Sequence, residues 1–428
     1  MINAIKDAAK VFSGQSASFV IRFITSILVA RWLGAEGKGL YASLIMIPNM
    51  MVTLGELGTR QSIIYYLGRG IFSLNSIVNT AIVLISSMTV PLALLCLLIY
   101  NNYYISLFPL ISQLFAILII PITLLVKVLS GVFLGLNKVG IYSKVTWIPA
   151  IIELTMCSFL VKFLHFGLVG AVISLVLGSL FTIFYGLSLV VKDVTFNLKY
   201  CQLSVAKAIV TKGVLFALAL FIIQINYRID VFLLKSMVPM DDIGVYSVGV
   251  SLSEVLWQIP SAIAVVILAR TATSNSDSQK YRVAQALRVS LITMTVISLI
   301  AVIVLNYLIP VIYGTDYSRS VVINRILMVG TVIFTFYKIL NSRIAGQGKP
   351  LITLLLFIPC LLVKVMLNLW LVPIYGIIGA AWASNISYLL ASLLILIAFC
   401  KIEQISIKEV LVFKKNDFLF LSNLPPKL

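Results

Sequence analysis

Twelve apolar blocks of transmembrane length divide this chain, and they constrain its fold more than any other feature. A helix needs about 20 apolar residues to cross the hydrocarbon core of a bilayer. Strands of an outer-membrane barrel are about ten residues long and alternate in polarity, whereas these blocks are longer and apolar throughout. We therefore predict an all-α integral membrane protein with twelve transmembrane helices. The predicted spans are 11–33, 41–66, 77–100, 108–134, 145–164, 168–191, 213–235, 243–269, 289–312, 321–343, 351–372 and 376–400.

The composition agrees with this fold class and argues against a catalytic role. Of the 428 residues, 61% are hydrophobic and 11% charged, whereas about 25% are charged in soluble domains. The outer connections, such as NNYYIS and YGTDYSR, are too short to carry a catalytic site, so we expect no enzyme. Five scattered cysteines without CxxC spacing favour neither a disulfide framework nor a metal site, and no cofactor is expected.

The net charge of +18 could indicate nucleic-acid binding, but its distribution indicates membrane topology instead. With the N-terminus placed in the cytoplasm, 20 of the 32 lysines and arginines lie on the cytoplasmic side, 6 lie outside and 6 lie within spans. This bias follows the positive-inside rule. Both termini are therefore predicted to be cytoplasmic, and no nucleic-acid partner is expected.

An internal repeat organises the spans into two halves. Gly39 and Tyr41 of GAEGKGLYA precede their counterparts Gly244 and Tyr246 in MDDIGVYSVG by 205 positions. GLNKVGIYS at Gly135 matches GQGKPLITL at Gly346, and FGLVGAVIS at residue 166 matches YGIIGAAWA at residue 375, at offsets of 211 and 209. Three matches in one order indicate a duplication. Because each half has six spans, the repeat is parallel, and such transporters hold substrate between the halves near the midplane.

This repeat predicts the domain organisation. We expect an N-terminal six-helix lobe at 1–200, a C-terminal six-helix lobe at 201–403 and a basic cytoplasmic tail at 404–428. Lys408, Lys414 and Lys415 make the tail suited to anionic lipid.

Ten charged residues lie in the interior of the predicted spans, five or more residues from either end. A charge at the bilayer centre costs at least about 2.5–3.5 kcal/mol, so these side chains must pair, snorkel or line a wet cavity. The six cations are Arg22, Arg60, Lys127, Arg228, Lys338 and Lys364, and the four acids are Glu56, Glu153, Asp230 and Glu254.

The stretch FIIQINYRIDVFLL, residues 221–234, concentrates this polarity in the seventh span. Arg228 and Asp230 are two residues apart and point about 200° away from each other, so they cannot satisfy one another. Gln224 shares a face with Arg228, and Asn226 shares another with Asp230. A helix that is polar on two sides near its middle favours an internal aqueous cavity. Arg22 lies at the equivalent depth in the first span, so both halves offer an arginine.

For the remaining charges, structural and functional roles both stay open. Arg60 and Lys364 are candidates for the cationic cavity, or for structural contacts, either with Glu56, which lies four residues before Arg60, or with another helix. Lys127 and Lys338 occupy equivalent spans and are further candidate cavity cations. Glu153 and Glu254 could be ion-pair partners or proton carriers, and Asp230, Glu56 and Glu254 are candidates for coupling transport to protons or sodium.

These motifs together resemble the polysaccharide-type (O-antigen) flippases of the multidrug/oligosaccharidyl-lipid/polysaccharide exporter superfamily, which also contains the multidrug and toxin extruders (MATE) and the lipid II flippase. The resemblance covers nearly the whole chain. It rests on VARWLGAEGKGLYA, LGELGTRQSIIYYLGRG, INYRIDVFLL followed by IGVYSVGVSL, IPSAIAVVILAR, and the paired FGLVGA and YGIIGA.

The resemblance implies a MATE-like V-shaped pair of six-helix lobes that alternates between inward-open and outward-open states. The implied substrate is an undecaprenyl-diphosphate-linked oligosaccharide, moved to the outer leaflet of the bacterial cytoplasmic (inner) membrane for lipopolysaccharide O-antigen or capsule biosynthesis. Membrane lipids and the polysaccharide polymerase machinery are the other implied partners. Relatives have a cationic central cavity, which Arg22 and Arg228 match in type and depth.

Three other classes of protein fit the sequence less well. A MATE-like antiporter of drugs or organic cations should present an acidic cavity, which six cations against four acids argue against. A membrane glycosyltransferase or polymerase needs a substantial external loop. A structural scaffold would not explain buried charges matched between halves. Coupling to protons, to sodium or to the membrane potential alone is left open.

Overall fold

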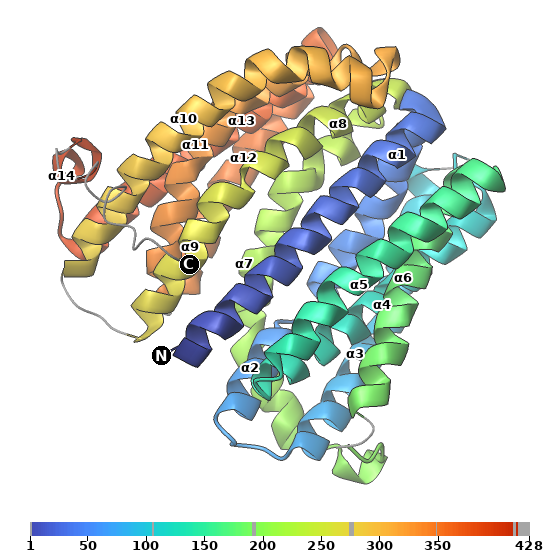
Figure 1. The fold of residues 1–428 in the computed structure, drawn as a ribbon, viewed down its shortest axis with the longest axis vertical. Helices are drawn as coiled ribbons and strands as arrows, with labels where there is room; N and C mark the ends of the chain where they lie inside the picture. Colours follow the sequence, from blue (N-terminus) through green and yellow to red (C-terminus); the bar gives the residue numbers. More distant parts are fainter. Residues whose placement is uncertain are drawn as a thin grey trace. The chain divides into compact units, whose positions relative to one another are not determined.

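The protein is all-helical in the computed structural model, which describes residues 2–104, 107–190, 194–273, 278–347, 349–413 and Asp417. No strand occurs within those ranges, so the predicted all-α class is confirmed (Figure 1). The helices are α1 (Ile2–Gly55), α2 (Thr59–Gly68), α3 (Leu74–Tyr103), α4 (Leu110–Gly135), α5 (Val139–Cys157), α6 (Gly167–Val190), α7 (Leu203–Leu234), α8 (Met240–Leu256), α9 (Gln258–Thr273), α10 (Ser278–Tyr313), α11 (Ser320–Gly346), α12 (Pro350–Tyr375), α13 (Ile377–Glu403) and α14 (Ile407–Leu411). Three single turns, η1 (Ser158–Phe163), η2 (Leu198–Tyr200) and η3 (Thr315–Tyr317), complete the regular structure of these residues.

Ten helical runs within the described residues are long and apolar enough to cross a membrane, or 11 if the bent pair α8–α9 is one span. The chain is therefore a multi-pass membrane protein. The predicted spans 11–33 and 41–66 fall within a single run, Ser13–Gly68, in this count. The number twelve consequently stays a prediction.

Helix α1 contains the first of those spans and residues 41–55 of the second, because the expected connection between them is itself helical. Its one non-helical residue is Gly34, with φ 70° and ψ −177°. A positive φ is accessible to glycine without the penalty that a Cβ atom imposes. Gly34 therefore interrupts the helix within residues 34–40, where the sequence predicted a connection between two spans.

Two other predicted spans are interrupted. The second one changes helix after Gly55, where Leu57 and Gly58 adopt positive φ before α2 begins. The eighth consists of α8 and α9, which meet at an angle of 41°. Pro260 explains this bend, because it has no N–H to donate to the carbonyl of Leu256, the last residue of α8.

The α-carbon contacts divide the chain into two compact units: residues Met1–Gln224 with Pro239–Gly244, and residues Ile225–Val238 with Val245–Leu428. The predicted division into 1–200, 201–403 and a tail at 404–428 stays a prediction. Of the tail lysines, Lys408 lies in α14, whereas Lys414, Lys415 and Lys427 lie outside the described residues.

In the first unit, α1 packs against α5, and α5 and α4 pack against α6. Val29 of α1 belongs to a buried cluster with Cys157, Val161 and Ala171, which Trp32, Leu33 and Tyr41 cover. The buried Tyr100 hydroxyl donates to the Leu44 carbonyl over 2.6 Å and ties α3 to α1.

The first unit also brings together two landmarks of the internal repeat. A methyl group on Gly39 would collide with the carbonyl oxygen of Met240, and one on Gly244 would collide with that of Ala35. Helix α1 and the start of α8 therefore approach each other at backbone distance, as small residues permit in membrane helix pairs.

In the second unit, α13 packs against α11 and α12, and α11 also contacts α9 and α10. Its interior is rich in aromatic rings: Phe334 lies 4.7 Å from Tyr388 and 5.1 Å from Trp257, measured between ring centroids. Near the C-terminus, the Arg288 guanidinium of α10 binds Asp417 through two hydrogen bonds of 2.7 and 2.8 Å. This buried pair holds the end of the described chain on α10.

Candidate functional site

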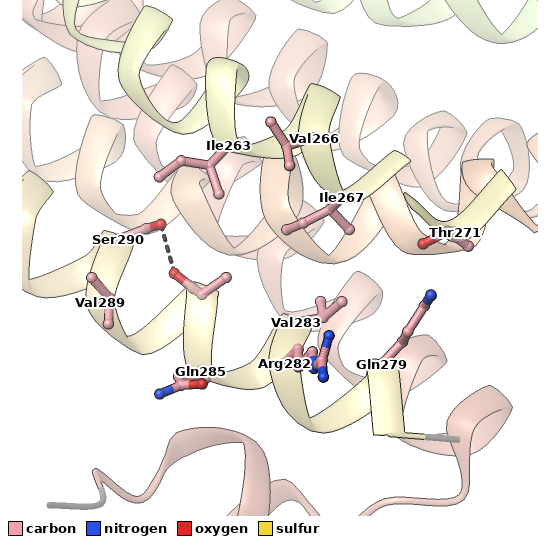
Figure 2. Close-up of a pocket in the computed structure, with 11 residues that line it drawn as sticks. Ile263, Val266, Ile267, Thr271, Gln279, Arg282, Val283, Gln285, Val289 and Ser290 are labelled. Atoms are coloured by element: carbon pink, nitrogen blue, oxygen red, sulfur yellow. Dashed lines mark hydrogen bonds between the residues drawn. The ribbon is translucent and has the colours of Figure 1, made fainter. Parts of the chain in front are cut away.

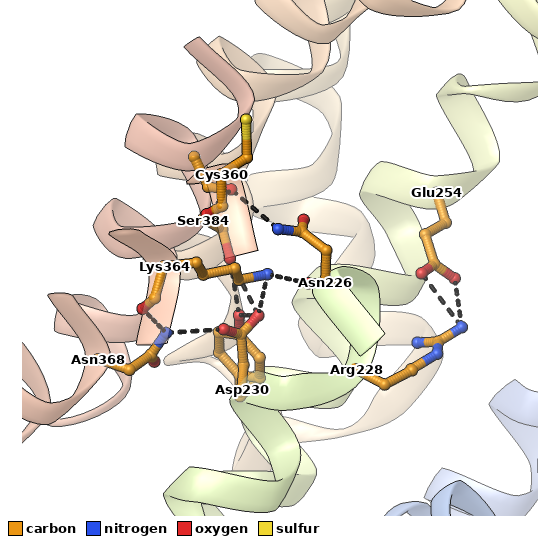
Figure 3. Close-up of polar contacts among 10 residues, drawn as sticks. Asn226, Arg228, Asp230, Glu254, Cys360, Lys364, Asn368 and Ser384 are labelled. Atoms are coloured by element: carbon orange, nitrogen blue, oxygen red, sulfur yellow. Dashed lines mark hydrogen bonds and ion pairs between the residues drawn. The ribbon is translucent and has the colours of Figure 1, made fainter. Parts of the chain in front are cut away.

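A fully buried ion pair lies within the second unit (Figure 3). The Lys364 ammonium on α12 is 2.8 Å from Oδ2 of Asp230 on α7 and donates to the Asn226 carbonyl over 2.6 Å. Lys364 is 0% exposed and Asp230 is 2% exposed. A buried charge of this kind persists only when it is paired and hydrogen-bonded.

The Asp230 carboxylate accepts three further hydrogen bonds. Its Oδ2 atom accepts from the Tyr246 hydroxyl at 2.8 Å and from the Ser384 hydroxyl at 3.0 Å. Its Oδ1 atom accepts from Nδ2 of Asn368 at 3.0 Å. Donors from α8, α12 and α13 thus converge on one side chain of α7, which fixes four helices together.

Asn226 links the network around Asp230 to residues of α12 and α13. Its Nδ2 atom donates to Ser387 at 3.0 Å, and Ser387 donates to the Cys360 carbonyl. Asn226 is 0% exposed, so its amide serves the packing of α7 against α12 and α13. Gln224, the other candidate amide of the stretch, is half-buried in α7.

Arg228 uses a different partner from Asp230, as their 200° separation predicted. Its guanidinium contacts both carboxylate oxygens of Glu254 on α8, each at 3.2 Å. The Arg228 side chain remains 36% exposed and that of Glu254 25%. Because a guanidinium has five N–H donors, this pairing leaves Arg228 able to bind a second acceptor.

Lys338 on α11 lies beside the aromatic cluster of the second unit. Its ammonium is 5.1 Å from the ring centroid of Trp257 and 5.7 Å from that of Phe334, distances at which a cation–π attraction operates. A void of about 10 Å³ between Asp230, Glu254 and Tyr388 has room for about one water. The interior of this unit is therefore closely packed around its charges.

In the first unit, the acids are buried and the cations are half-exposed. Nη1 of Arg22 is 2.7 Å from Oε2 of Glu153, with side-chain exposures of 45% and 7%. Nζ of Lys127 is 3.4 Å from Oε2 of Glu56, with exposures of 35% and 9%. Each carboxylate is held inside the helix bundle, whereas each cation keeps donors available to a ligand.

Arg60 contacts a side chain of another helix and not Glu56. Arg60 and Glu56 do not share a continuous helix, because residues 56–58 separate α1 from α2. Nη2 of Arg60 instead donates to the Tyr142 hydroxyl on α5 at 3.1 Å, and Gln15 donates to the same hydroxyl. The Glu56 carboxylate is left to Lys127.

The structure thus distributes the candidate residues among separate pairs. Arg22 contacts Glu153, and Arg228 contacts Glu254, so both glutamates form the ion pairs that the sequence analysis considered. Their assignment, with that of Arg60, Lys127, Lys338 and Lys364, to a substrate cavity stays a prediction. Partners that the sequence reasoning missed are Tyr142, Tyr246, Asn368, Ser384 and Ser387. Polar residues within otherwise apolar spans were the available signal.

The helical architecture of this chain is similar to that of solved transporters described as members of the MOP superfamily. The chain is similar to a solved structure described as the lipid II flippase MurJ in an inward closed conformation, with a TM-score of 0.75 and 15% identity over 99% of this chain and 94% of that one. It is also similar to a MATE transporter of Vibrio cholerae, with a TM-score of 0.65 and 13% identity over 94% of this chain and 98% of that one. These likenesses establish the fold.

The chain belongs to the family described as polysaccharide biosynthesis protein, because the profile of that family matches residues 4–271. The resemblance inferred from the sequence motifs is thereby confirmed. Among curated proteins, the chain is 24% identical over 291 residues to an uncharacterised membrane protein of Methanocaldococcus jannaschii, covering 64% of this chain and 68% of that protein.

Proposed function

We propose that this protein is a flippase that moves an undecaprenyl-diphosphate-linked oligosaccharide from the cytoplasmic to the outer leaflet by alternating access. The product would be used to build a surface polysaccharide such as O-antigen or capsule. The observation that carries the proposal is the partial exposure of Arg22 and Arg228, 45% and 36%, while each arginine contacts a glutamate. Membership of the polysaccharide biosynthesis family supports it.

The chemistry of the cations suits a diphosphate. Guanidinium groups bind phosphate oxygens through charge-assisted and often bidentate hydrogen bonds. Glu153 and Glu254 already hold one edge of each arginine, which orients the remaining N–H groups and moderates the net positive charge. Moderate affinity allows the headgroup to be released after translocation. Arg60, Lys127 and Lys338 would add to the same attraction.

Lys364 has a different place in this proposal. Its ammonium is enclosed by Asp230 and the Asn226 carbonyl and is 0% exposed. Binding of substrate by Lys364 would therefore require a conformation in which α7 and α12 separate.

The membrane potential could supply the driving force. Outward movement of each net negative charge gains about 2.3 kcal/mol per 100 mV of inside-negative potential. Asp230, Glu56 and Glu254 are the side chains through which protons or sodium would act if the transport is ion-coupled.

We place the protein in the bacterial cytoplasmic membrane with both termini inside. Polymerase machinery would receive the product there. We assign the protein no catalytic activity.

The test replaces Arg228 with alanine and, separately, with lysine in the native host. We expect Arg228→Ala to reduce surface polysaccharide at least tenfold and to accumulate the lipid-linked precursor facing the cytoplasm. Arg228→Lys should retain part of the export, since it keeps the charge but loses the bidentate geometry. Arg325→Ala is the matched control, because Arg325 is exposed on α11 and bonds only the Asn306 amide among the contacts of the described residues.

Normal export in Arg228→Ala and Arg22→Ala would refute the assigned role of the arginines. Loss of resistance to cationic drugs in a strain without the protein, together with unchanged polysaccharide, would instead identify an organic-cation antiporter. Measurement of both phenotypes in one set of strains separates these outcomes.

A further inference from the structure

A groove lies between α9 and α10 (Figure 2), and none of the candidate site residues described above lines it. Its volume is about 500 Å³, within the range of small-molecule sites. Its walls are largely apolar, and Figure 2 shows the side chains of the two helices facing one another across it. The apolar lining residues are Ile263, Val266, Ile267, Val283, Ala286 and Val289.

One end of the groove is polar and basic. Figure 2 shows Thr271 and Gln279 at one end of the groove, and Arg282 lies about one helical turn further along α10. Arg282 is exposed and has no acidic partner within the residues that the structure describes. This end belongs to the connection 270–288, which the distribution of basic residues predicts to be cytoplasmic.

A second pocket of about 210 Å³ shares Arg282 and Gln285 with the groove. Its acids are already engaged: Asp417 binds Arg288, and Glu409 accepts hydrogen bonds from the backbone and side chain of Ser406. Arg282 is therefore the cation available there to an anionic group.

The dimensions of the groove match one leaflet of a bilayer. Gln279 and Ser290 are 11 residues apart, which corresponds to about 16 Å along α10. The hydrocarbon core is about 30 Å thick, so the groove is about half as long as the core. Its α9 wall, Ile263 to Ile267, lies within the predicted span 243–269, whereas most of its α10 wall lies in the predicted cytoplasmic connection 270–288, so the groove lies at the cytoplasmic boundary of the membrane. A single apolar trough with a cation at its cytoplasmic end fits a lipid that has one long chain and a phosphate.

We infer that the α9–α10 groove is a loading site for the polyprenyl carrier of the substrate, with the isoprenoid chain in the trough and its phosphate at Arg282. This inference rests on the proposed flippase function. A phospholipid fits less well, because its second chain would remain outside the single trough.

The test uses undecaprenyl monophosphate carrying a photoreactive group in its chain, added to the purified full-length protein in nanodiscs. We expect cross-links to map to α9 and α10 at the lining residues. Val266→Trp fills the trough and should weaken binding at least tenfold. Val265→Trp is the matched control, because the Val265 side chain is 66% exposed and does not line the groove. Arg282→Ala should weaken binding of the phosphate form several-fold but leave the corresponding polyprenol unaffected.

Equal binding by the Val265→Trp and Val266→Trp variants would overturn the inference, provided that both elute as monodisperse protein. Displacement of the probe by an equal mole fraction of phosphatidylglycerol would also overturn it, because the groove would then be a general lipid site. If Val266→Trp abolishes probe binding but cells export polysaccharide normally, the loading site is refuted and the flippase function stands. If deletion of the protein leaves export intact while the probe still binds, the proposed function is refuted instead.

Discussion

The individual ion pairs of the first unit are asymmetric, and this asymmetry determines which substitution is harmful. Glu153 is buried, whereas Arg22 is nearly half-exposed. Removing the arginine leaves a carboxylate inside the protein without its counter-ion. Removing the charge of the glutamate leaves an arginine that water or a ligand can still reach. The two partners of one pair therefore do not make equal contributions to stability.

We accordingly expect Arg22→Ala to lower the free energy of unfolding by about 1–3 kcal/mol, the cost of leaving a buried polar group without its partner. Glu153→Gln should lower it by less than about 1 kcal/mol, because the amide still accepts from Arg22. Denaturation of the purified protein in mixed micelles measures both. The double variant Arg22→Ala/Glu153→Gln should recover stability without recovering export. Recovery of export would show that Arg22 acts only by neutralising Glu153.

The buried pair of the second unit should be more sensitive. Breaking a buried ion pair by removing one partner costs about 3–5 kcal/mol, so Lys364→Met should destabilise the protein by that amount. Asp230→Asn combined with Lys364→Met should cost less, because no uncompensated charge remains. Lys338→Met is the control: its cation–π contacts are worth about 0.5–1 kcal/mol. Equal losses for Lys364→Met and Lys338→Met would contradict the closed geometry around Asp230.

At this scale, the sequence predicted which side chains carry charge in the spans but only some of their partners. The two-residue separation of Arg228 and Asp230 correctly assigned them to different partners. A helical wheel cannot tell which neighbouring helix faces a given side, so Tyr142, Asn368 and Ser384 were missed. Of the two structural alternatives for Arg60, the structure shows the contact with another helix, through Tyr142 of α5, because residues 56–58 interrupt the helix that would have placed Arg60 beside Glu56.

At the scale of the helices, the contact between α1 and the start of α8 depends on two positions that must be glycine. Gly39 and Gly244 are matched landmarks of the repeat, and neither has room for a Cβ atom. Since the atoms that a methyl group would meet belong to backbone carbonyls, the clash cannot be relieved by rotating a side chain. The duplication thus supplied both small residues of one helix contact.

We expect Gly39→Ala to destabilise the protein by at least about 1–3 kcal/mol, the usual cost of forcing extra methyl groups into a packed site. Gly140→Ala is the matched control. At Gly140, near the start of α5, no neighbouring atom lies within 4 Å of the position that a methyl group would take. Alanine there should be neutral or gain about 0.5–1 kcal/mol through its higher helix propensity. The free energies of unfolding and the yields of folded protein test the pair. Comparable stability of the two variants would show that α1 and α8 can separate at little cost.

Most predicted spans lie largely within single helices, because hydrophobic length is a property of consecutive residues, but α7 and α10 begin 10 and 11 residues before the spans predicted there. The interruptions within spans were less predictable. Pro260 lies inside the predicted eighth span, but the effect of an internal proline depends on whether neighbouring helices favour a straight or a bent segment. Gly34 was placed in a connection rather than in a helix break, because a glycine among polar residues fits both.

For the whole molecule, the sequence predicted the fold class and the family because both depend on features spread over the full length. The distribution of basic residues also makes a prediction about orientation, which is a matter for labelling experiments. The positive-inside rule places the connection 192–212 in the cytoplasm and the connection 236–242 outside. Both connections contain exposed positions suited to labelling, Lys199 and Ser236.

Single cysteines at Lys199 and Ser236 test this orientation. The partly exposed Cys201 and Cys400 are first replaced with serine, whereas Cys96, Cys157 and Cys360 are buried. In intact cells with a permeabilised outer envelope, a membrane-impermeant maleimide should label Ser236→Cys at least tenfold faster than Lys199→Cys. Opening the cytoplasmic membrane should make the two rates similar. The reverse order in intact cells would place both termini outside and, with them, Arg282 at the wrong leaflet for loading a carrier lipid. Orientation therefore links the charge pattern of the entire chain to the direction in which the proposed substrate moves.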